Sequence, residues 1–139
     1  MVSSHAGIGY NDLSAARSAL IVFQALKGLL MIVRIAVFKG RVKDHLQTDF
    51  ETHVTHKMLP LIASFPGISS VGVLRTDGGD GVFTDACLAL EMRYPDLSAM
   101  ERALASPERA QNAKETEVLL AMVDDPSVSH AVFKVIGQG

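Results

Sequence analysis

The stretch Phe50–Leu61, FETHVTHKMLPL, is the segment on which the fold prediction depends. Apolar residues recur at helical spacing through and beyond it, which predicts an amphipathic helix over Lys43–Phe65. Pro60 lies inside this pattern, removes one backbone donor and should kink or loosen the last turn. Pro66 and Gly67 then end the helix.

Four segments around this helix predict strands: Ile32–Lys39, which is dense in β-branched residues, Ile68–Arg75, Val82–Tyr94, and Ser129–Ile136, which is of alternating character. Gly40 should close the first strand, and the glycine-rich turn Thr76–Gly81 should join the second and third strands in a hairpin. A second helical region precedes the last strand. Asp96 caps a short helix there, and Ser106 caps a longer one that runs to about Met122.

From Met31 onward the predicted order is strand, helix, strand, strand, helix, strand. This order is typical of the α+β ferredoxin-like fold, βαββαβ, in which a four-stranded antiparallel sheet carries its helices on one face. Strands that are apolar on both faces need a second covering layer, so we expect a homodimer in which two sheets face one another. Residues 31–139 are predicted to form this domain. Residues 1–30 are predicted to be an N-terminal extension, a flexible leader followed by a helix from Leu13 to Leu30.

Composition narrows the classes of partner. The chain has 139 residues, of which 48% are apolar and 20% charged, and a formal net charge of -2. Without a basic cluster, neither nucleic acid nor an anionic membrane surface is expected as a partner. The apolar stretch Ala19–Phe38 is interrupted by charged residues and is a poor membrane span. The single Cys87 excludes an internal disulfide and favours a reducing compartment, so we expect a cytoplasmic protein.

His53 is the first candidate for chemistry. On a helical wheel it lies at the edge of the apolar face with Lys57 nearby, while His56 points largely to solvent. A half-buried imidazole titrates near neutrality and could move a proton to or from a bound enol or phenol. The alternative is a boundary histidine that is hydrogen-bonded to backbone. His45 is too far from His53 along the helix for these histidines to form a metal site, and none is expected.

Polar residues also interrupt the apolar strands. They either line a cavity or interface, or face solvent at a sheet edge and pair across a dimer. The residues are Arg34, Lys39, Arg93, Tyr94, His130 and Lys134. Cys87 is expected to be a small core residue.

Together these motifs resemble the EthD-like branch of the dimeric α/β-barrel superfamily. The resemblance lies in FETHVTHKMLPLIASFPGI and, some forty residues later, in DLSAMERALASPERAQNA. The matching residues are Phe50, His53, Leu59, Pro60, Leu61, Pro66, Gly67 and the run from Ala105 to Glu108. Met58 stands where the family has a second histidine, which leaves His53 as the only retained motif histidine.

The resemblance implies a small apolar pocket between sheet and helices that accepts a hydrophobic aromatic or polyketide-like compound. It also implies cofactor-free acid/base or oxidative chemistry, as in monooxygenase-like oxidoreductases, cyclases or isomerases. His53 would then be the catalytic acid or base. The substrate-binding residues would be Lys57, Arg34, Phe38, Phe50 and Tyr94. The alternative is a non-catalytic accessory or binding protein of a degradative or biosynthetic pathway, in which His53 is structural.

Overall fold

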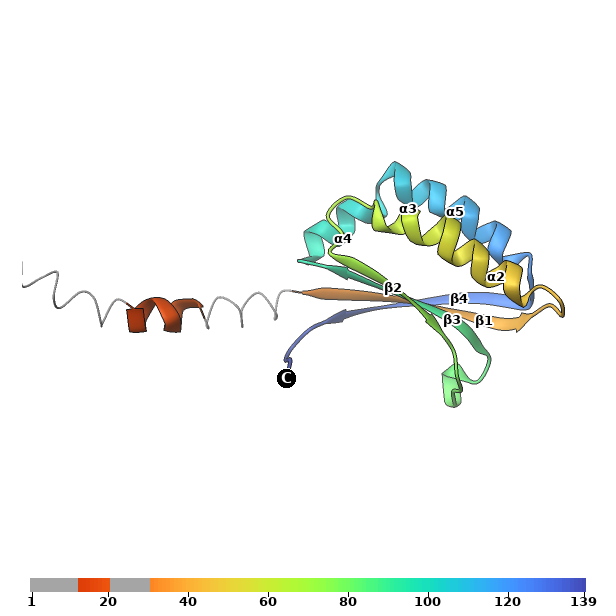
Figure 1. The fold of residues 1–139 in the computed structure, drawn as a ribbon, viewed down its shortest axis with the longest axis horizontal. Coiled ribbons are helices and arrows are strands. Elements are labelled where there is room, and N and C mark those ends of the chain that lie inside the picture. The colour runs from red at the N-terminus through yellow and green to blue at the C-terminus, as the bar shows by residue number, and fades with distance from the viewer. Residues whose placement is uncertain (1–12, 21–30) are drawn as a thin grey trace, which may run out of the picture.

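A four-stranded antiparallel sheet carries helices on one face (Figure 1). The computed structural model describes residues 13–20 and 31–139. The strands are β1 (Ile32–Val42), β2 (Ser70–Arg75), β3 (Ala86–Tyr94) and β4 (Val123–Lys134), in the order β2-β3-β1-β4. The helices are α2 (Gln47–His53), η1 (Val54–Met58), α3 (Leu59–Ala63), α4 (Leu97–Leu104) and α5 (Pro107–Leu120), with a short 3-10 turn η2 at Gly81–Phe83. The predicted ferredoxin-like fold is confirmed.

The predicted N-terminal extension lies largely outside the described residues. Residues 13–20 are helical, and their side chains are exposed. The division of the chain at residue 30 stays a prediction.

The helix that contains Pro60 departs from regular α-helical geometry next to the proline. The helix starts at Gln47, later than the predicted Lys43, and Val54–Met58 form a π-helical turn immediately before Pro60. The backbone N–H of Leu59 bonds to the carbonyl of Val54, five residues back, so the turn is wider than an α-helical turn. The loosening expected at Pro60 is therefore confirmed, although it appears on the N-terminal side of the proline.

The prediction that Gly40 closes the first strand is wrong. Gly40 has a φ of 126°, a conformation open mainly to glycine, and β1 continues beyond it to Val42 with a register shift against β4. A Cβ on Gly40 would lie 2.5 Å from Cγ1 of Val123, so glycine is required sterically as well. The last strand also begins earlier than predicted, at Val123. Pro126 is tolerated inside it because β4 is an edge strand and the register is irregular there.

The two predicted caps of the second helical region are confirmed. The Asp96 side chain accepts a hydrogen bond from the Ala99 N–H at 2.8 Å and begins α4. The Ser106 hydroxyl accepts from the Arg109 N–H at 3.2 Å and begins α5 at Pro107. These caps fix where α5 starts, and with it the side chains that α5 presents to the sheet.

The core lies between the helices and the sheet. Its largest fully buried side chains are Tyr94, Phe50, Met58, Ile62, Leu119 and Val54. The opposite face of the sheet carries Val33, Ile35 and Val37 of β1 beside Ala131 and Phe133 of β4. Within the described residues no helix covers that face, and Phe133 is 52% exposed there (Figure 1).

Candidate functional site

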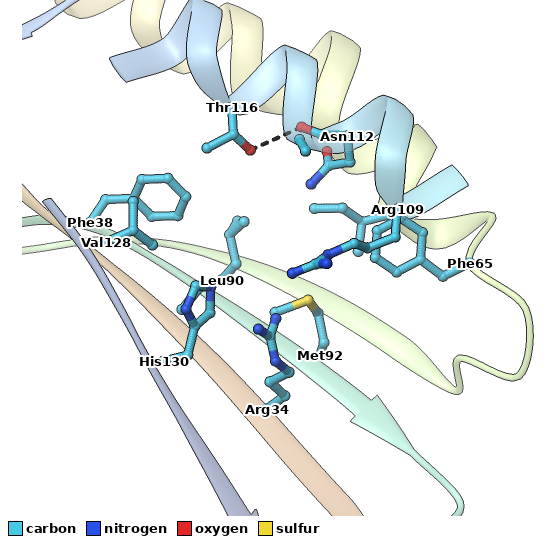
Figure 2. A pocket seen from close by; sticks show the side chains of 13 residues that line it. Arg34, Phe38, Phe65, Leu90, Met92, Arg109, Asn112, Thr116, Val128 and His130 are labelled. Atoms are coloured by element: carbon cyan, nitrogen blue, oxygen red, sulfur yellow. Dashed lines mark hydrogen bonds between the residues drawn. The ribbon is translucent and has the colours of Figure 1, made fainter. Parts of the chain in front are cut away.

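A cavity of about 180 Å³ lies between the sheet and helices α3 and α5. Figure 2 shows side chains from β1, β3, β4 and α5 converging on it. Its lining residues are Arg34, Ala36, Phe38, Ile62, Phe65, Leu90, Met92, Arg109, Asn112, Ala113, Thr116, Val128 and His130. The side chains are mostly apolar with a few convergent polar groups, a composition typical of small-molecule sites.

The strand register gives the cavity two unlike ends. Phe38 of β1 is paired with Val128 of β4 and with Leu88 of β3, and this end is apolar. Arg34, four residues earlier on β1, is paired with Met92 of β3, and this end is cationic. Alternate residues of a strand share a face, so Arg34, Ala36 and Phe38 line the floor in that order.

Arg34 and Arg109 bring two positive charges to the same end of the cavity. They reach it from opposite walls, Arg34 from β1 and Arg109 from the first turn of α5 (Figure 2). Burial, and next the charge of Arg109, lower the pKa of Arg34. Neither guanidinium forms an ion pair with any residue among 13–20 and 31–139, and no carboxylate lines the cavity.

His130 lies midway between the two ends, opposite Ala36 in the β1–β4 pairing. Solvent reaches it from the mouth of the cavity, where Arg109 is also exposed. Burial on its inner side lowers the pKa of His130, and the charges of Arg34 and Arg109 lower it further. This shift favours the neutral imidazole near pH 7, the form in which one ring nitrogen can accept a proton.

Two buried polar atoms near the cationic end have no hydrogen-bond partner among the described residues. They are Oδ1 of Asn112, which lines the cavity, and the hydroxyl of Tyr94. Burial raises the pKa of Tyr94, while the positive charges of Arg34 and Arg109 oppose that rise. Tyr94 itself is fully buried and does not line the cavity.

The structure divides the predicted site residues into two groups. Arg34 and Phe38 line the cavity, as expected for substrate-binding residues. Phe50 is buried in the core away from it, and Lys57 is exposed on the helix surface. Their predicted roles in substrate binding have no support from this geometry.

His53 lies between two helices and does not line the cavity. Its Nε2 atom is 2.9 Å from the backbone oxygen of Glu115 on α5 and 3.3 Å from the Glu115 Oε2 atom. The side chain is only 11% exposed. This geometry matches the alternative of a boundary histidine bonded to backbone, and the catalytic role of His53 stays a prediction. Met58, which stands at the position of the family's second histidine, is fully buried in the core.

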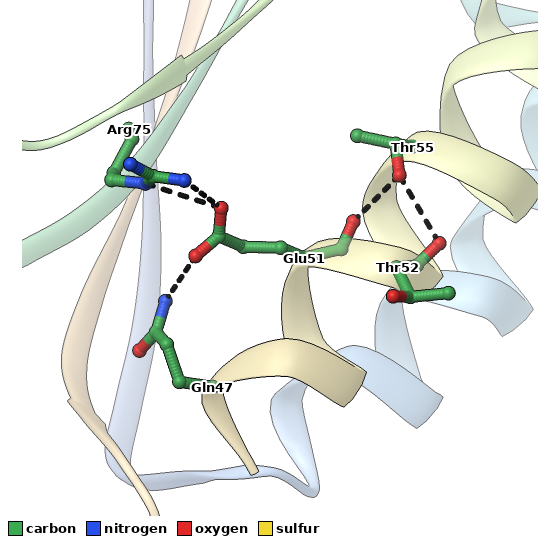
Figure 3. Close-up of polar contacts among 5 residues, drawn as sticks. All are labelled: Gln47, Glu51, Thr52, Thr55 and Arg75. Carbon is green, nitrogen blue, oxygen red and sulfur yellow. Dashed lines mark hydrogen bonds and ion pairs between the residues drawn. The ribbon is translucent and has the colours of Figure 1, made fainter.

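A second hollow of about 200 Å³ lies beside Phe50, between α2 and the sheet. Its polar rim is already paired (Figure 3): Glu51 accepts from Nε of Arg75 at 3.1 Å and from Nε2 of Gln47 at 2.8 Å. These hydrogen bonds, the one from Arg75 first, lower the pKa of Glu51. The hollow thus offers no unpaired charge to a ligand, in contrast to the cavity at Arg34.

The sequence did not identify the α5 contribution to the site. Arg109, Asn112, Ala113 and Thr116 follow the spacing of one helix face, which points at the sheet. The sequence did contain one signal for this part of the site. The helix must pack on a sheet, yet it presents polar residues on the face that does so.

Within residues 13–20 and 31–139, no group of three or more His, Cys, Asp or Glu comes together as a metal site would require. No helix in this part of the chain is long and apolar enough to span a membrane.

No family model and no curated protein matches the chain by sequence. Solved structures do match it by fold. An ethyl tert-butyl ether D (EthD) family protein from Bacillus halodurans C-125 aligns with a TM-score of 0.56 and 20% identity, covering 73% of this chain and 96% of that chain. A variant of SnoaB, a cofactor-independent oxygenase from Streptomyces nogalater, aligns with a TM-score of 0.57 and 18% identity, covering 78% and 96%.

A DABB family protein with a ferredoxin-like fold from Mesorhizobium loti aligns with a TM-score of 0.60 and 17% identity, covering 77% of this chain and 98% of that chain. At these identities the likeness concerns the fold. The chain therefore has the ferredoxin-like fold that is also found in an EthD family protein, in SnoaB and in a DABB protein.

Proposed function

We propose that this chain is an EthD-like protein that binds a small aromatic compound in the cavity between sheet and α5 and moves a proton on it without a cofactor. The observation that supports this most strongly is His130, a neutral imidazole between an apolar pocket end and two guanidinium groups. The cofactor-independent oxygenase among the structures of the same fold is consistent with such chemistry.

In the proposed step, His130 accepts a proton from an acidic C–H or O–H group of the bound molecule. The electron pair stays on the substrate as an enolate or phenolate, and Arg34 and Arg109 stabilise the new negative charge. Return of the proton to another atom completes a tautomerisation, so atoms and charge balance without an oxidant.

The test is exchange of the α-hydrogens of phenolic ketones such as 2-hydroxyacetophenone into D₂O, followed by NMR. We expect the protein to accelerate exchange and His130→Gln to slow it by about 10² or more. His53→Gln is the matched control and should leave the rate unchanged. Loss of exchange in His53→Gln with normal exchange in His130→Gln would instead place the chemistry at His53.

A non-catalytic binding protein is the second candidate, and the open mouth of the cavity favours it. Arg109 and His130 are both exposed, so water is not excluded from the reacting position as closed active sites require. Saturable binding of the same ketones with exchange at the uncatalysed rate would establish this alternative.

We further propose that two copies associate through the uncovered faces of their sheets and work in a reducing compartment such as the cytoplasm. Ile35, Val37 and Phe133 supply the apolar surface, and one structure of the same fold is described as dimeric.

A further inference from the structure

We infer that the cavity takes an aromatic carboxylate of about one ring, with its carboxylate between Arg34 and Arg109 and its ring against Phe38, Leu90 and Val128. The inference rests on the function proposed above and names the substrate class of that site.

The uncompensated charge is the first support. Arg34 is partly buried in the sheet, and a second guanidinium faces the same space with no carboxylate in the lining. Two like charges brought together and partly removed from water repel each other and lose hydration, which destabilises the empty site. An anion placed between them reverses both effects, and guanidinium groups match the two oxygens of a carboxylate particularly well.

The two unlike ends are the second support. Inorganic anions would need only the cationic end, whereas this cavity continues along β1 from Arg34 past Ala36 to Phe38. Val128, which is paired with Phe38, closes the apolar end, and Leu90 lies opposite Ala36 in the middle of the cavity. A molecule that satisfies both ends has a charged group joined directly to an apolar body.

The volume of the cavity limits the size of the apolar part of the ligand. A cavity of about 150 Å³ lined by apolar side chains accommodates benzene, so the 180 Å³ here accepts one ring with small substituents. Polycyclic compounds of the polyketide kind would have to project through the mouth.

Asn112 bears on which substituents the ligand ring carries. Its Oδ1 atom is buried without a partner among the described residues and lies on the α5 wall of the cavity, one turn beyond Arg109. An unpaired buried acceptor is costly, but water does not reach this atom, so a hydroxyl on the ligand ring would satisfy it only if the Asn112 amide rotates towards the cavity.

The experiment is an NMR chemical-shift titration of the full chain near pH 7 with benzoate, with benzamide as its neutral counterpart, and with inorganic phosphate. Arg34→Met and Arg109→Met remove each charge and keep an unbranched side chain. Lys114→Met removes a charge from the same helix at a position outside the cavity lining.

We expect benzoate to bind about tenfold or more tightly than benzamide, and each arginine variant to lose about that advantage. Benzamide binding should be equal in all variants, which also shows that they are folded, and Lys114→Met should behave as the unmodified protein.

Equal binding of benzamide and benzoate would overturn the carboxylate assignment and leave the proposed small-molecule function intact. Phosphate binding as tight as benzoate would overturn the aromatic part of the assignment. Failure of both aromatic ligands to bind would overturn the inference and the proposed function together.

Discussion

Arg34 is a charged residue on a central strand, on the face that otherwise builds the core. Its neighbours along that face of β1 are Ile32, Ala36 and Phe38, all buried. A guanidinium is retained at such a position only if something compensates its lost hydration. Among residues 13–20 and 31–139 no carboxylate pairs with Arg34, so we place the compensating charge on the ligand.

His130 should make ligand binding depend on pH. The groups that act on it are Arg34 from β1 and Arg109 from α5, both charged throughout, and together with burial they lower its pKa in the free protein. A bound carboxylate opposes that lowering, so the complex takes up a proton more readily than the free protein. Affinity for benzoate should therefore rise as the pH falls from about 8 to about 5.5, below the ordinary pKa of histidine. Titrations across this range should show the trend, and His130→Gln should remove it. A flat profile in the unmodified protein would contradict this role of His130.

The lowered pKa of His130 also affects the stability of the free protein, and here a fall in pH is unfavourable. Because the folded state holds the pKa of His130 below its unfolded value, the unfolded state binds the proton more readily. The contribution of His130 to stability is therefore present at high pH and is lost as the pH falls below about 6.5 towards the folded-state pKa.

Tyr94→Phe tests whether a buried hydroxyl is truly unpaired. Because the Tyr94 hydroxyl has no partner among the described residues, its removal should leave the free energy of unfolding unchanged or raise it by about 1 kcal/mol. Urea denaturation measures this directly. A loss of more than about 1 kcal/mol would mean that the hydroxyl is satisfied in the folded protein.

At this scale the sequence indicated half of the site. Arg34 and His130 were conspicuous because they interrupt apolar strands, and Phe38 shares their sheet. Arg109 and Asn112 were missed because polar residues on an isolated helix look solvated. Only the angle at which α5 packs on the sheet shows that they face a cavity.

Among the elements, β1 and the α2–α3 helix show how one residue can redirect a segment. Pro60 produces a π-helical turn and leaves the helix continuous, and Gly40 produces a bulge and leaves β1 continuous to Val42. The sequence predicted that Pro60 would loosen the helix and that Gly40 would end the strand. The effect of each residue on its element depended on the neighbouring element against which it packs or pairs. For Gly40 this neighbour is β4.

Gly40→Ala should destabilise the protein by at least about 2 kcal/mol, because its positive φ is strained for alanine and its Cβ would meet Val123 and the Asp124 carbonyl. Gly72→Ala on β2 is the matched control, since its Cβ would have nothing within 4 Å and its φ is ordinary. Thermal unfolding of both variants compares them. Equal melting temperatures would show that the bulge at Gly40 is not needed.

In the whole molecule, as far as residues 13–20 and 31–139 describe it, helices cover one face of the sheet and leave the other uncovered. The fold itself could be predicted, because apolar periodicity and cap chemistry agree for nearly every element and together permit few topologies. The strand ends and the full set of residues that line the cavity could not be predicted, because they depend on long-range pairing across β1 and β4 and on the packing of α5.

Phe133→Asp should convert the proposed dimer into a monomer, because a charge would replace exposed apolar surface on the uncovered face. Val118→Asp on α5 is the control, since Val118 is 50% exposed and Phe133 is 52% exposed. Light scattering after size exclusion gives the mass of each. A monomeric unmodified protein, or a dimer that survives Phe133→Asp, would refute the face-to-face arrangement.

The central claim is that the site is the cavity below α5 and that it holds an organic anion. A crystal structure of the protein with benzoate tests this most directly. We expect electron density for the carboxylate between Arg34 and Arg109, with the ring directed towards Phe38 and Val128. Benzoate bound beside His53 or in the hollow at Phe50, with the cavity at Arg34 empty, would contradict it.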